Sequence, residues 1–587
     1  MKQILYLLLG CLIPFQFLTA KMYSSPERTP VDYVNPYIGN ISHLLVPTYP
    51  TVHLPNSMLR VYPERENFTG NTINGLPLIV TSHRGSSAFN LSPYQGELQK
   101  AGSIIQYGYD NEVIKPYYYS VDLDDDGMYV QYAPSHQSGI YQIDFSQTDK
   151  PAYLIFNTRN GELKTDGKSI SGYQKLGNHT QVYIYLETDQ QPLKIGTHQG
   201  AVIRTTDKST QGHNAYYILE YPKGTASVLL RYGVSFISSE QAKQNLRREI
   251  KNYNLQAVAD KGRSVWNETL GKIFVKGGTE NEKTVFYTSL YRTYERMICI
   301  SEDGRYFSAY DGQVHDDEGI PFYVDDWIWD TYRATHPLRL IIETEMESNM
   351  VNSLIRMAYQ MQPNWMPTFP EINGDSRRMN CNHGVATVLD AYNKGMRSFD
   401  LAKAYQVCKA AITEKTLAPW SSKPAGVLDQ FYKDHGYFPA LAVGEQETVP
   451  EVHSWERRQP AAVTLGTVYD EWCLGNIAQA LGDKKEADYF LKRSLNYHKI
   501  FNKETCFFHP KDSFGNFIQP FDYRYSSGVG GRDAYDENNG WVYRWDLPHN
   551  VADLVNMMGG KERFVEELER MYSTPSVSYT HLTLPTT

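Results

Sequence analysis

Residues 535–545 place two acidic side chains within a strongly aromatic stretch of the sequence. An apolar setting disfavours the charged form of a carboxyl group, so such a group can stay protonated and act as a general acid. Glu537 is the candidate for that role, although the neighbouring Asp536 could be the acid instead or a solvated side chain. Trp541, in the same stretch, is a candidate for stacking on a sugar ring.

A second cluster, residues 325–333, combines indole rings with carboxylates. Indoles offer a stacking platform and carboxylates accept hydrogen bonds from hydroxyl groups, so Trp329, Asp330 and Arg333 are candidate substrate-binding residues. The alternative is structural: Trp329 and Tyr332 would belong to the core, and Asp330 and Arg333 would form an i, i+3 ion pair on a helix. The spacing alone favours neither interpretation.

A third cluster, residues 373–384, lies immediately before a predicted helix. From the helix entrance, Asn382 or His383 could form hydrogen bonds with sugar hydroxyls, which makes His383 a further candidate substrate-binding residue. A helix cap or a satisfied core histidine is the alternative. The five cysteines after residue 20 are widely spaced and include no CxxC motif, so they indicate neither a disulfide framework nor a zinc site.

The elements that must hold these clusters divide the chain into two parts. Residues 30–238 contain segments rich in aromatic and β-branched residues, such as 117–121 and 181–186, separated by turn residues at intervals typical of a sandwich. The sequence therefore predicts an N-terminal β-sandwich over residues 30–238. Helical spacing of apolar residues predicts a linker helix over residues 239–272.

From residue 273 to residue 576 the apolar pattern is helical. Residues 464–481 and 484–501 predict two long amphipathic helices, and the short connection Gly482-Asp483 forces them to lie antiparallel. Several such hairpins indicate an (α/α) toroid, which holds its active site in loops at one end of the barrel. The predicted fold class is a β-sandwich followed by an (α/α) toroid that is incomplete in this chain.

Both ends of the chain carry segments outside these domains. Residues 1–20, with Lys2 before an apolar stretch, predict a signal peptide for export to the periplasm or cell surface; the alternative is a lipoprotein with a lipidated Cys11. No later segment is apolar enough to span a membrane. Residues 577–587 lack periodicity, which predicts a non-native tail after a gene truncated near Ser576. The net charge of -9, without a long basic run, argues against a nucleic-acid partner.

In their order along the chain, these clusters and several other segments resemble glycoside hydrolase family 92. Each segment is weak evidence by itself, but their shared order over residues 32–572 is specific. The matching segments are residues 34–39, 282–291, 329–333, 390–395, 469–473, 537–543 and 548–550.

The resemblance implies a calcium-dependent exo-α-mannosidase that acts with inversion on mannose-containing glycans, with an N-terminal β-sandwich packed on an (α/α) barrel. The family's general acid is the first residue of a Glu-Gly-Asn-Ala-Trp-Gln-Tyr segment, and Glu537 occupies that position here. Asn538, Gly540 and Val542 depart from the segment, which puts any sugar contact of its glutamine in doubt. Residues 44–50 also stand where members of the family often carry a Gly-rich, Phe-Pro-Gly segment, which indicates a divergent branch with an altered linkage or substrate.

The same resemblance implies that the general base and much of the calcium site follow Tyr572, so the sequence assigns neither the base nor any metal ligand. Two alternatives share the fold: another (α/α)-barrel glycosidase, or a glycoside phosphorylase that needs phosphate rather than calcium. An alternative from a different class of protein is a glycan-binding protein with a degenerate catalytic site.

Overall fold

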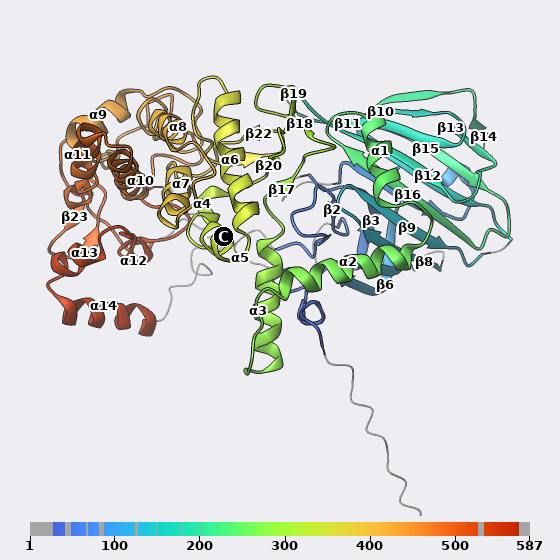
Figure 1. The fold of residues 1–587 in the computed structure, drawn as a ribbon, viewed down its shortest axis with the longest axis horizontal. Helices are drawn as coiled ribbons and strands as arrows, with labels where there is room; N and C mark the ends of the chain where they lie inside the picture. Colours follow the sequence, from blue (N-terminus) through green and yellow to red (C-terminus); the bar gives the residue numbers. More distant parts are fainter. Residues whose placement is uncertain are drawn as a thin grey trace, which may run out of the picture.

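The computed structural model describes residues 28–41, 48–65, 69–81, 87–123, 127–147, 149–177, 179–200, 202–525 and 533–574. The predicted signal peptide (residues 1–20), the alternative lipidation of Cys11 and the predicted tail (residues 577–587) lie outside the described residues. Figure 1 shows a β domain beside a helical domain; α3 lies near their junction, while α1 lies over the sheet and α2 runs along the β domain.

The β domain lies between Val52 and Ser235. Its strands are β1 (Val52–His53), β2 (Arg60–Val61), β3 (Thr72–Asn74), β4 (Leu76–Pro77), β5 (Phe89–Tyr94), β6 (Gln106–Lys115), β7 (Tyr118–Leu123), β8 (Met128–Pro134), β9 (Ser138–Asp144), β10 (Ala152–Thr165), β11 (Ser169–Gly177), β12 (Thr180–Thr188), β13 (Lys194–Gln199), β14 (Val202–Arg204), β15 (Ser209–Tyr221) and β16 (Ser227–Ser235). All but β1 and β2 belong to one 14-stranded antiparallel sheet.

The sheet branches at its longest strand, β10. Strand β15 pairs with β10 from Ala152 to Lys164, while β5 and β11 share the opposite edge of β10. Along β12, buried Val182, Ile184 and Leu186 alternate with half-buried residues, as expected for a strand with one face in the core. The alternation of residues that predicted this strand therefore places every second side chain in the core.

Two helices occupy the segment for which one linker helix was predicted. Helix α1 (Ser239–Glu249) packs against β16 and β12, and α2 (Leu255–Leu270) begins after a break. The Ser238 hydroxyl caps α1 by accepting from the Gln241 N–H, and the Asn254 side chain caps α2 by accepting from the Ala257 N–H. The prediction of a single helix missed this second cap.

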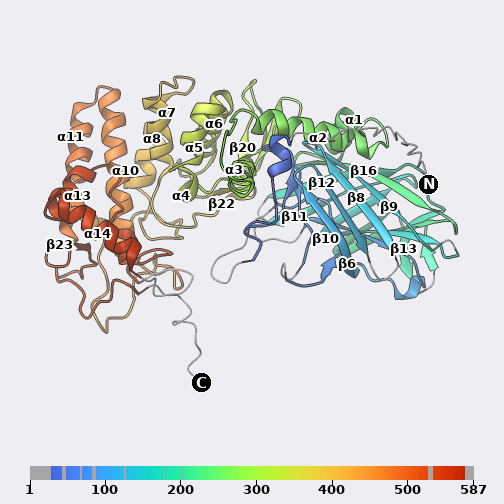
Figure 2. The same ribbon diagram turned by 90° about the horizontal axis from the view of Figure 1, so that it is seen from below.

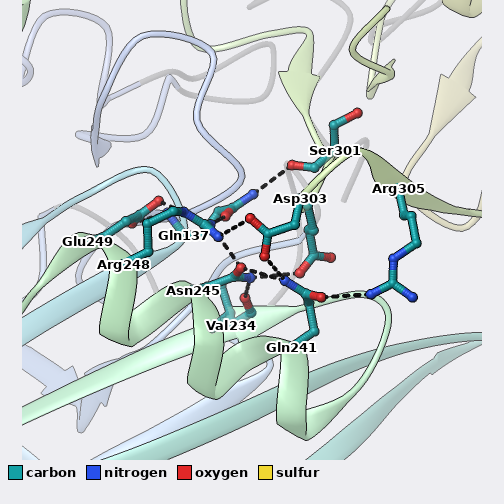
Figure 3. A network of polar contacts seen from close by, with 10 residues as sticks. Gln137, Val234, Gln241, Asn245, Arg248, Glu249, Ser301, Asp303 and Arg305 are labelled. Carbon is teal, nitrogen blue, oxygen red and sulfur yellow. Dashed lines mark hydrogen bonds and ion pairs between the residues drawn. The ribbon is translucent and has the colours of Figure 1, made fainter. Parts of the chain in front are cut away.

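Polar contacts tie α1 to both domains, as Figure 3 shows. From α1, Gln241 Nε2 and Arg248 Nη1 donate to the Asp303 carboxylate at 2.6 and 2.5 Å. From the β domain, Gln137 Nε2 donates to the Ser301 carbonyl at 2.8 Å. Residues 301–303 precede the hairpin of β18 (Arg305–Ser308) and β19 (Gln313–Asp316). The start of the helical domain is therefore fixed against the β domain.

The remaining elements form the helical domain. Its helices are α3 (Glu280–Thr293), α4 (Ile328–Thr331), α5 (Thr335–Ile342), α6 (Thr344–Gln360), α7 (Gly384–Asn393), α8 (Leu401–Thr413), α9 (Val427–His435), α10 (Pro460–Ala480), α11 (Lys484–Arg493), α12 (Gly540–Tyr543), α13 (Val551–Met557) and α14 (Lys561–Ser573). Short strand pairs are β17 (Ile298–Cys299) with β20 (Tyr323–Val324), β21 (Pro370–Glu371) with β22 (Gly374–Asp375), and β23 (Phe501–Asn502) with β24 (Phe507–Phe508).

Helices α10 and α11 form the predicted αα-hairpin. Helix α10 is not amphipathic, however. Helices α7, α8 and α11 pack around it, and most of its side chains are buried. Figure 2 shows α7, α8, α10 and α11 side by side. The predicted order of a large antiparallel β domain followed by a helical domain is confirmed. No helix in the described part of the chain has the length and apolarity of a membrane span.

Candidate active site

Helix α4 with the two residues after it, the loop before α7, the first turns of α10, residues 536–546 around α12, and helix α14 converge around a cavity of about 630 Å³, here called the site cavity. Its volume falls in the range of roughly 300–1,000 Å³ that is common for ligand pockets. Five of the six predicted site residues line it: Trp329, Asp330, Arg333, His383 and Glu537. The structure therefore brings together residues from three separate sequence clusters.

Four carboxyl groups of the described residues, those of Asp330, Asp536, Glu537 and Asp546, line this cavity. The Asp330 carboxyl is open to the cavity, but surrounding protein atoms limit its hydration. This desolvation, with the nearby charges of Glu537 and Asp326, raises the pKa of Asp330 to about 7. A carboxyl group that is partly protonated near neutral pH can donate or accept a hydrogen bond, which suits a hydroxyl-rich ligand.

Glu537 has a left-handed backbone conformation, with φ of 50°. Such a conformation is unfavourable for a residue with a Cβ atom and is concentrated at functional sites. The half-buried Glu537 precedes the one-turn helix α12, which the Asn539 side chain caps by accepting from the N–H groups of Trp541 and Val542. The cap fixes the loop that presents Glu537 to the cavity.

Within the cavity wall, the buried side chain of Asn380 joins the three clusters. Its Nδ2 donates to Asp536 Oδ2 at 2.9 Å and to Gln459 Oε1 at 2.7 Å. Its Oδ1 accepts from Trp329 Nε1 at 3.3 Å. Asp536 is therefore a buried hydrogen-bond partner and not a solvated side chain. Asn380 links the indole of Trp329 to the residue that precedes Glu537.

His383 is both buried and held in one orientation. Its Nδ1 lies 2.7 Å from Asp470 Oδ1, and the second oxygen of Asp470 accepts from the Asn382 N–H at 2.7 Å. The ring of His383 packs on that of Tyr332 with centroids 4.2 Å apart. Tyr332 is buried, as the structural alternative predicted. His383 is buried as well and forms part of the cavity wall.

Arg333 is an exposed residue of the cavity lining and pairs with Asp546 of the same lining. Its Nη2 donates to Asp546 Oδ1 at 2.6 Å and its Nε donates to Tyr332 Oη at 2.8 Å. The i, i+3 alternative with Asp330 is not the pairing that the structure has. Asp546 was missed by the sequence analysis because its partner is more than 200 positions away along the chain.

Trp541 does not line the cavity, unlike the other predicted sugar-binding residues. Its ring makes an edge contact with Phe507 at 5.7 Å, and the Arg570 guanidinium lies 5.6 Å from the ring centre. Successive helical residues are rotated by about 100°, so Val542 and Tyr543 on α12 reach the cavity while Trp541 points elsewhere.

The segment that carries Trp329 and Asp330 is anchored from the β domain. Arg60 of β2 donates to Asp325 Oδ2 at 2.5 Å, and Arg296 Nη1 donates to Asp325 Oδ1 at 3.0 Å. The Arg296 guanidinium also lies 4.0 Å from the centre of the Trp327 ring. These buried ion pairs fix the position at which residues 325–333 enter the cavity wall.

A buried histidine behind the same segment was also missed. His336 bonds Asp326 Oδ2 through Nε2 at 2.8 Å and Glu347 Oε1 through Nδ1 at 2.7 Å. Burial alone would lower the pKa of His336, but the two carboxylates raise it to about 10. Asp326 also accepts from the Thr331 hydroxyl at 2.9 Å, so this charged cluster holds both ends of α4.

The site residues do not by themselves form a metal centre. Among the residues that the structure describes, no three His, Cys, Asp or Glu side chains are placed to hold a metal ion. Two cavity carboxylates, Asp536 and Asp546, are hydrogen-bonded to Asn380 and Arg333.

Comparison with known proteins identifies both domains. The glycosyl hydrolase family 92 N-terminal domain matches residues 33–235, and the glycosyl hydrolase family 92 catalytic domain matches residues 241–583. A family GH92 inverting mannosidase from Bacteroides thetaiotaomicron has a TM-score of 0.81 at 24% identity, over 96% of this chain and 76% of that one. A family GH92 alpha-mannosidase from the same organism, in complex with mannoimidazole, has a TM-score of 0.80 at 22% identity, over 93% and 74% of the two chains.

An "uncharacterized secreted glycosidase" from Arthroderma benhamiae is 22% identical over 96% of this chain and 76% of its own length. The two solved structures share the fold, and the catalytic-domain match alone spans more than half of the sequence. This chain is a glycoside hydrolase and belongs to family 92.

Proposed function

We propose that this enzyme is an exo-acting α-mannosidase that hydrolyses terminal α-mannosyl linkages of glycans with inversion of configuration. The observation that carries the proposal is that Glu537, to which the sequence resemblance assigns the family's general-acid role, lines one cavity with Trp329, Asp330, Arg333 and His383. Two family members of similar fold are an inverting mannosidase and an alpha-mannosidase with bound mannoimidazole, which supports mannose as the sugar.

In this proposal, Glu537 donates a proton to the glycosidic oxygen as the bond to the sugar breaks. Trp329 offers a flat apolar face to the pyranose ring. Asp330 and His383 form hydrogen bonds with hydroxyl groups, and the Asp470 carboxylate orients the His383 ring for this contact. An inverting hydrolase also needs a second carboxylate, about 6.5–9.5 Å from the acid, to activate water. We assign no residue of the described chain to that role.

Calcium dependence is general in family 92, and we propose it for this enzyme. Calcium binds carboxylate and carbonyl oxygens and would favour a distorted sugar by holding ring hydroxyls. The carboxylates of the described residues do not converge on one ion, so they do not make up a calcium site on their own. The steps proposed for Glu537, Asp330 and His383 therefore do not involve the metal.

We also propose that the enzyme acts outside the cytoplasm, in the periplasm or at the cell surface, on mannose-containing glycans. The support is the predicted signal peptide and the secreted glycosidase from Arthroderma benhamiae that the chain resembles.

The proposed function is tested by following hydrolysis of an aryl α-mannoside with proton NMR in the presence of calcium. We expect β-mannose to appear first and then to mutarotate, because an inverting enzyme releases the opposite anomer. The α anomer as first product would contradict inversion. Turnover of an aryl α-glucoside in place of the mannoside would contradict the sugar assignment.

A further inference from the structure

The carboxyl group of Glu302 is buried where the helical domain meets the β domain, and no step of the proposed chemistry uses it. Its Oε1 accepts from the Phe236 N–H, directly after β16, at 2.9 Å, and its Oε2 accepts from Asn245 Nδ2 of α1 at 2.7 Å. The same amide group of Asn245 donates to the Val234 carbonyl of β16 at 2.9 Å (Figure 3). One carboxyl group of the helical domain is therefore held by the β domain and by the helix that covers its sheet.

The segment that carries Glu302 is hydrogen-bonded to the segment that leads to the site cavity. Strand β17 pairs with β20, and the Ser301 hydroxyl continues this contact by accepting from the Phe322 N–H at 2.9 Å. Strand β20 leads directly into residues 325–330, which include Trp329 and Asp330 of the cavity wall. A displacement of Glu302 would therefore be transmitted to the wall of the site cavity.

Charged and titratable groups surround Glu302 on the sides of α1 and of the helical domain. They are Arg248 and Glu249 of α1, Asp303 and Arg305 of the same segment, Cys299 of β17 and Asp317 after β19. The β domain contributes the Ser235 hydroxyl and the Phe236 N–H, which carry no charge. The cation that acts on Glu302 is Arg248, whose guanidinium also donates to Asp303 Oδ1 at 2.5 Å.

Burial makes the ionised form of Glu302 unfavourable at this junction. Loss of hydration raises its pKa from 4.5 to about 7, although three hydrogen bonds and the charge of Arg248 favour the ionised form. Because the raised pKa belongs to the folded protein, the stabilisation is fully present below pH 4.5 and is lost as the pH rises through 7.

We infer that Glu302 is a proton-sensitive latch between the two domains: its protonated form keeps residues 298–305 docked on α1 and the end of β16, and its ionisation loosens them. The inference goes beyond the proposed function, because the latch acts on the position of the cavity wall and not on the chemistry. Its consequence for catalysis rests on the proposed function, since that consequence needs a substrate in the site cavity.

The test is hydrogen exchange measured by mass spectrometry on the unaltered protein from pH 4.5 to pH 8.5, with exposure times adjusted for the intrinsic pH dependence of exchange. We expect the protection of residues 298–302 and 322–324 to be at least about tenfold lower at pH 8 than at pH 5, and to level off above pH 7. Strand β10, in the middle of the sheet, should show no such change.

Two variants assign the effect to Glu302. Glu302→Gln cannot ionise, so the protection of residues 298–302 should not fall as the pH rises. Arg248→Gln keeps the carboxyl group but removes the cation that favours its ionisation, so the fall should level off at a higher pH than in the unaltered protein. The matched control is Glu471→Gln on α10, another buried glutamate whose pKa burial raises to about 7; residues 298–302 should respond to pH in this variant as in the unaltered protein.

A flat pH profile of residues 298–302 in the unaltered protein, an unchanged fall in Glu302→Gln, or an equal fall in β10 would overturn the inference. If Glu302→Gln does not fold, the Arg248→Gln profile decides, and an unshifted profile would overturn it. Turnover of an aryl α-mannoside is a separate readout: the ratio of kcat in Glu302→Gln to kcat in the unaltered enzyme should rise with pH, and a constant ratio would overturn the link to the site cavity. If neither protein turns over the mannoside, the proposed function fails, while the exchange profiles still decide whether the latch exists.

Discussion

Asp330 and Glu537 enter one cavity from distant parts of the chain, and desolvation together with the charge of Glu537 raises the pKa of Asp330 to about 7. A carboxyl group with a pKa near 7 is partly protonated at neutral pH, so Asp330 can donate a hydrogen bond to a sugar hydroxyl beside the proposed acid Glu537.

Glu537→Gln is expected to lower kcat/KM on a natural oligosaccharide by about 10²–10⁴-fold, the usual contribution of a general acid. The loss should be much smaller on an aryl mannoside with an acidic phenol, whose leaving group needs little protonation. Steady-state kinetics on both substrates provide the measurement. Asn538→Asp, at the next position of the same wall, controls for a local change of polarity. An equal loss on both substrates would rule out the acid role.

Asp330→Asn is expected to stabilise the protein at alkaline pH. The folded-state pKa of Asp330, about 7, lies above its usual 3.8. The stability associated with its protonated form is therefore fully present below pH 3.8 and is lost as the pH rises through 7. The variant should melt at a higher temperature than the unaltered protein at pH 8, and the two should converge near pH 4. Asp316→Asn, at an exposed position on β19, should show no such trend. A difference that is constant with pH would contradict the shifted pKa.

The sequence alone could identify candidate site residues whose neighbours along the chain are distinctive. Glu537 stands out because aromatic residues surround it within a few positions, and Asp330 because it lies beside two indoles. Period-two and helical patterns likewise predicted the two kinds of domain. The sequence analysis took the stretch around Trp541 as one surface, whereas α12 places Val542 and Tyr543, and not Trp541, in the lining of the cavity.

The residues that sequence missed depend on contacts between distant segments. Asn380 acts through partners 79 and 156 positions away, and no local pattern shows this. Helix α10 was predicted to be amphipathic, but its apolar residues are distributed around the whole helix, and α7, α8 and α11 pack against it.

Asn380→Ala is expected to lower kcat at least about tenfold, because displacements of about 1 Å in catalytic geometry can cost up to about 100-fold. The change removes the donor to Asp536 and the acceptor for the Trp329 indole. It should also destabilise the fold by about 1–3 kcal/mol, the cost of leaving a buried partner unsatisfied. The control is Asn476→Ala, which loses one hydrogen bond within α10. A loss of stability with unchanged kcat would make Asn380 a structural residue only.

Chelation is expected to abolish mannosidase activity in an enzyme that turns over aryl α-mannoside with calcium present. Calcium added back should restore the activity, and phosphate should not. The expectation follows from the calcium dependence of family 92, since oxygen ligands suit calcium and the described residues place no His or Cys cluster for a softer metal. Full turnover in excess chelator would contradict it, and phosphate-dependent release of a sugar phosphate would favour a phosphorylase.

His336→Gln is expected to destabilise the protein by about 3–5 kcal/mol at pH 7, since breaking a buried ion pair leaves charge uncompensated. The imidazolium is fully buried between Asp326 and Glu347, and these carboxylates raise its pKa to about 10 against the effect of burial. A raised histidine pKa means that the stabilisation is fully present below pH 6.5 and is lost as the pH rises through 10. Denaturant unfolding should therefore show a large difference between variant and unaltered protein at pH 7 and a smaller one at pH 10.5.

The control for that experiment is His498→Gln, which removes an exposed ion pair with Asp553 at 2.7 Å. Exposed pairs contribute about 0–1 kcal/mol, so this variant should stay close to the unaltered protein at both pH values. Because the cluster of His336 also fixes the segment of Asp330, the His336 variant should lose kcat before it unfolds. If His336→Gln matched the control at pH 7, the imidazole would be neutral in the folded protein, and Asp326 and Glu347 would need another explanation for their burial.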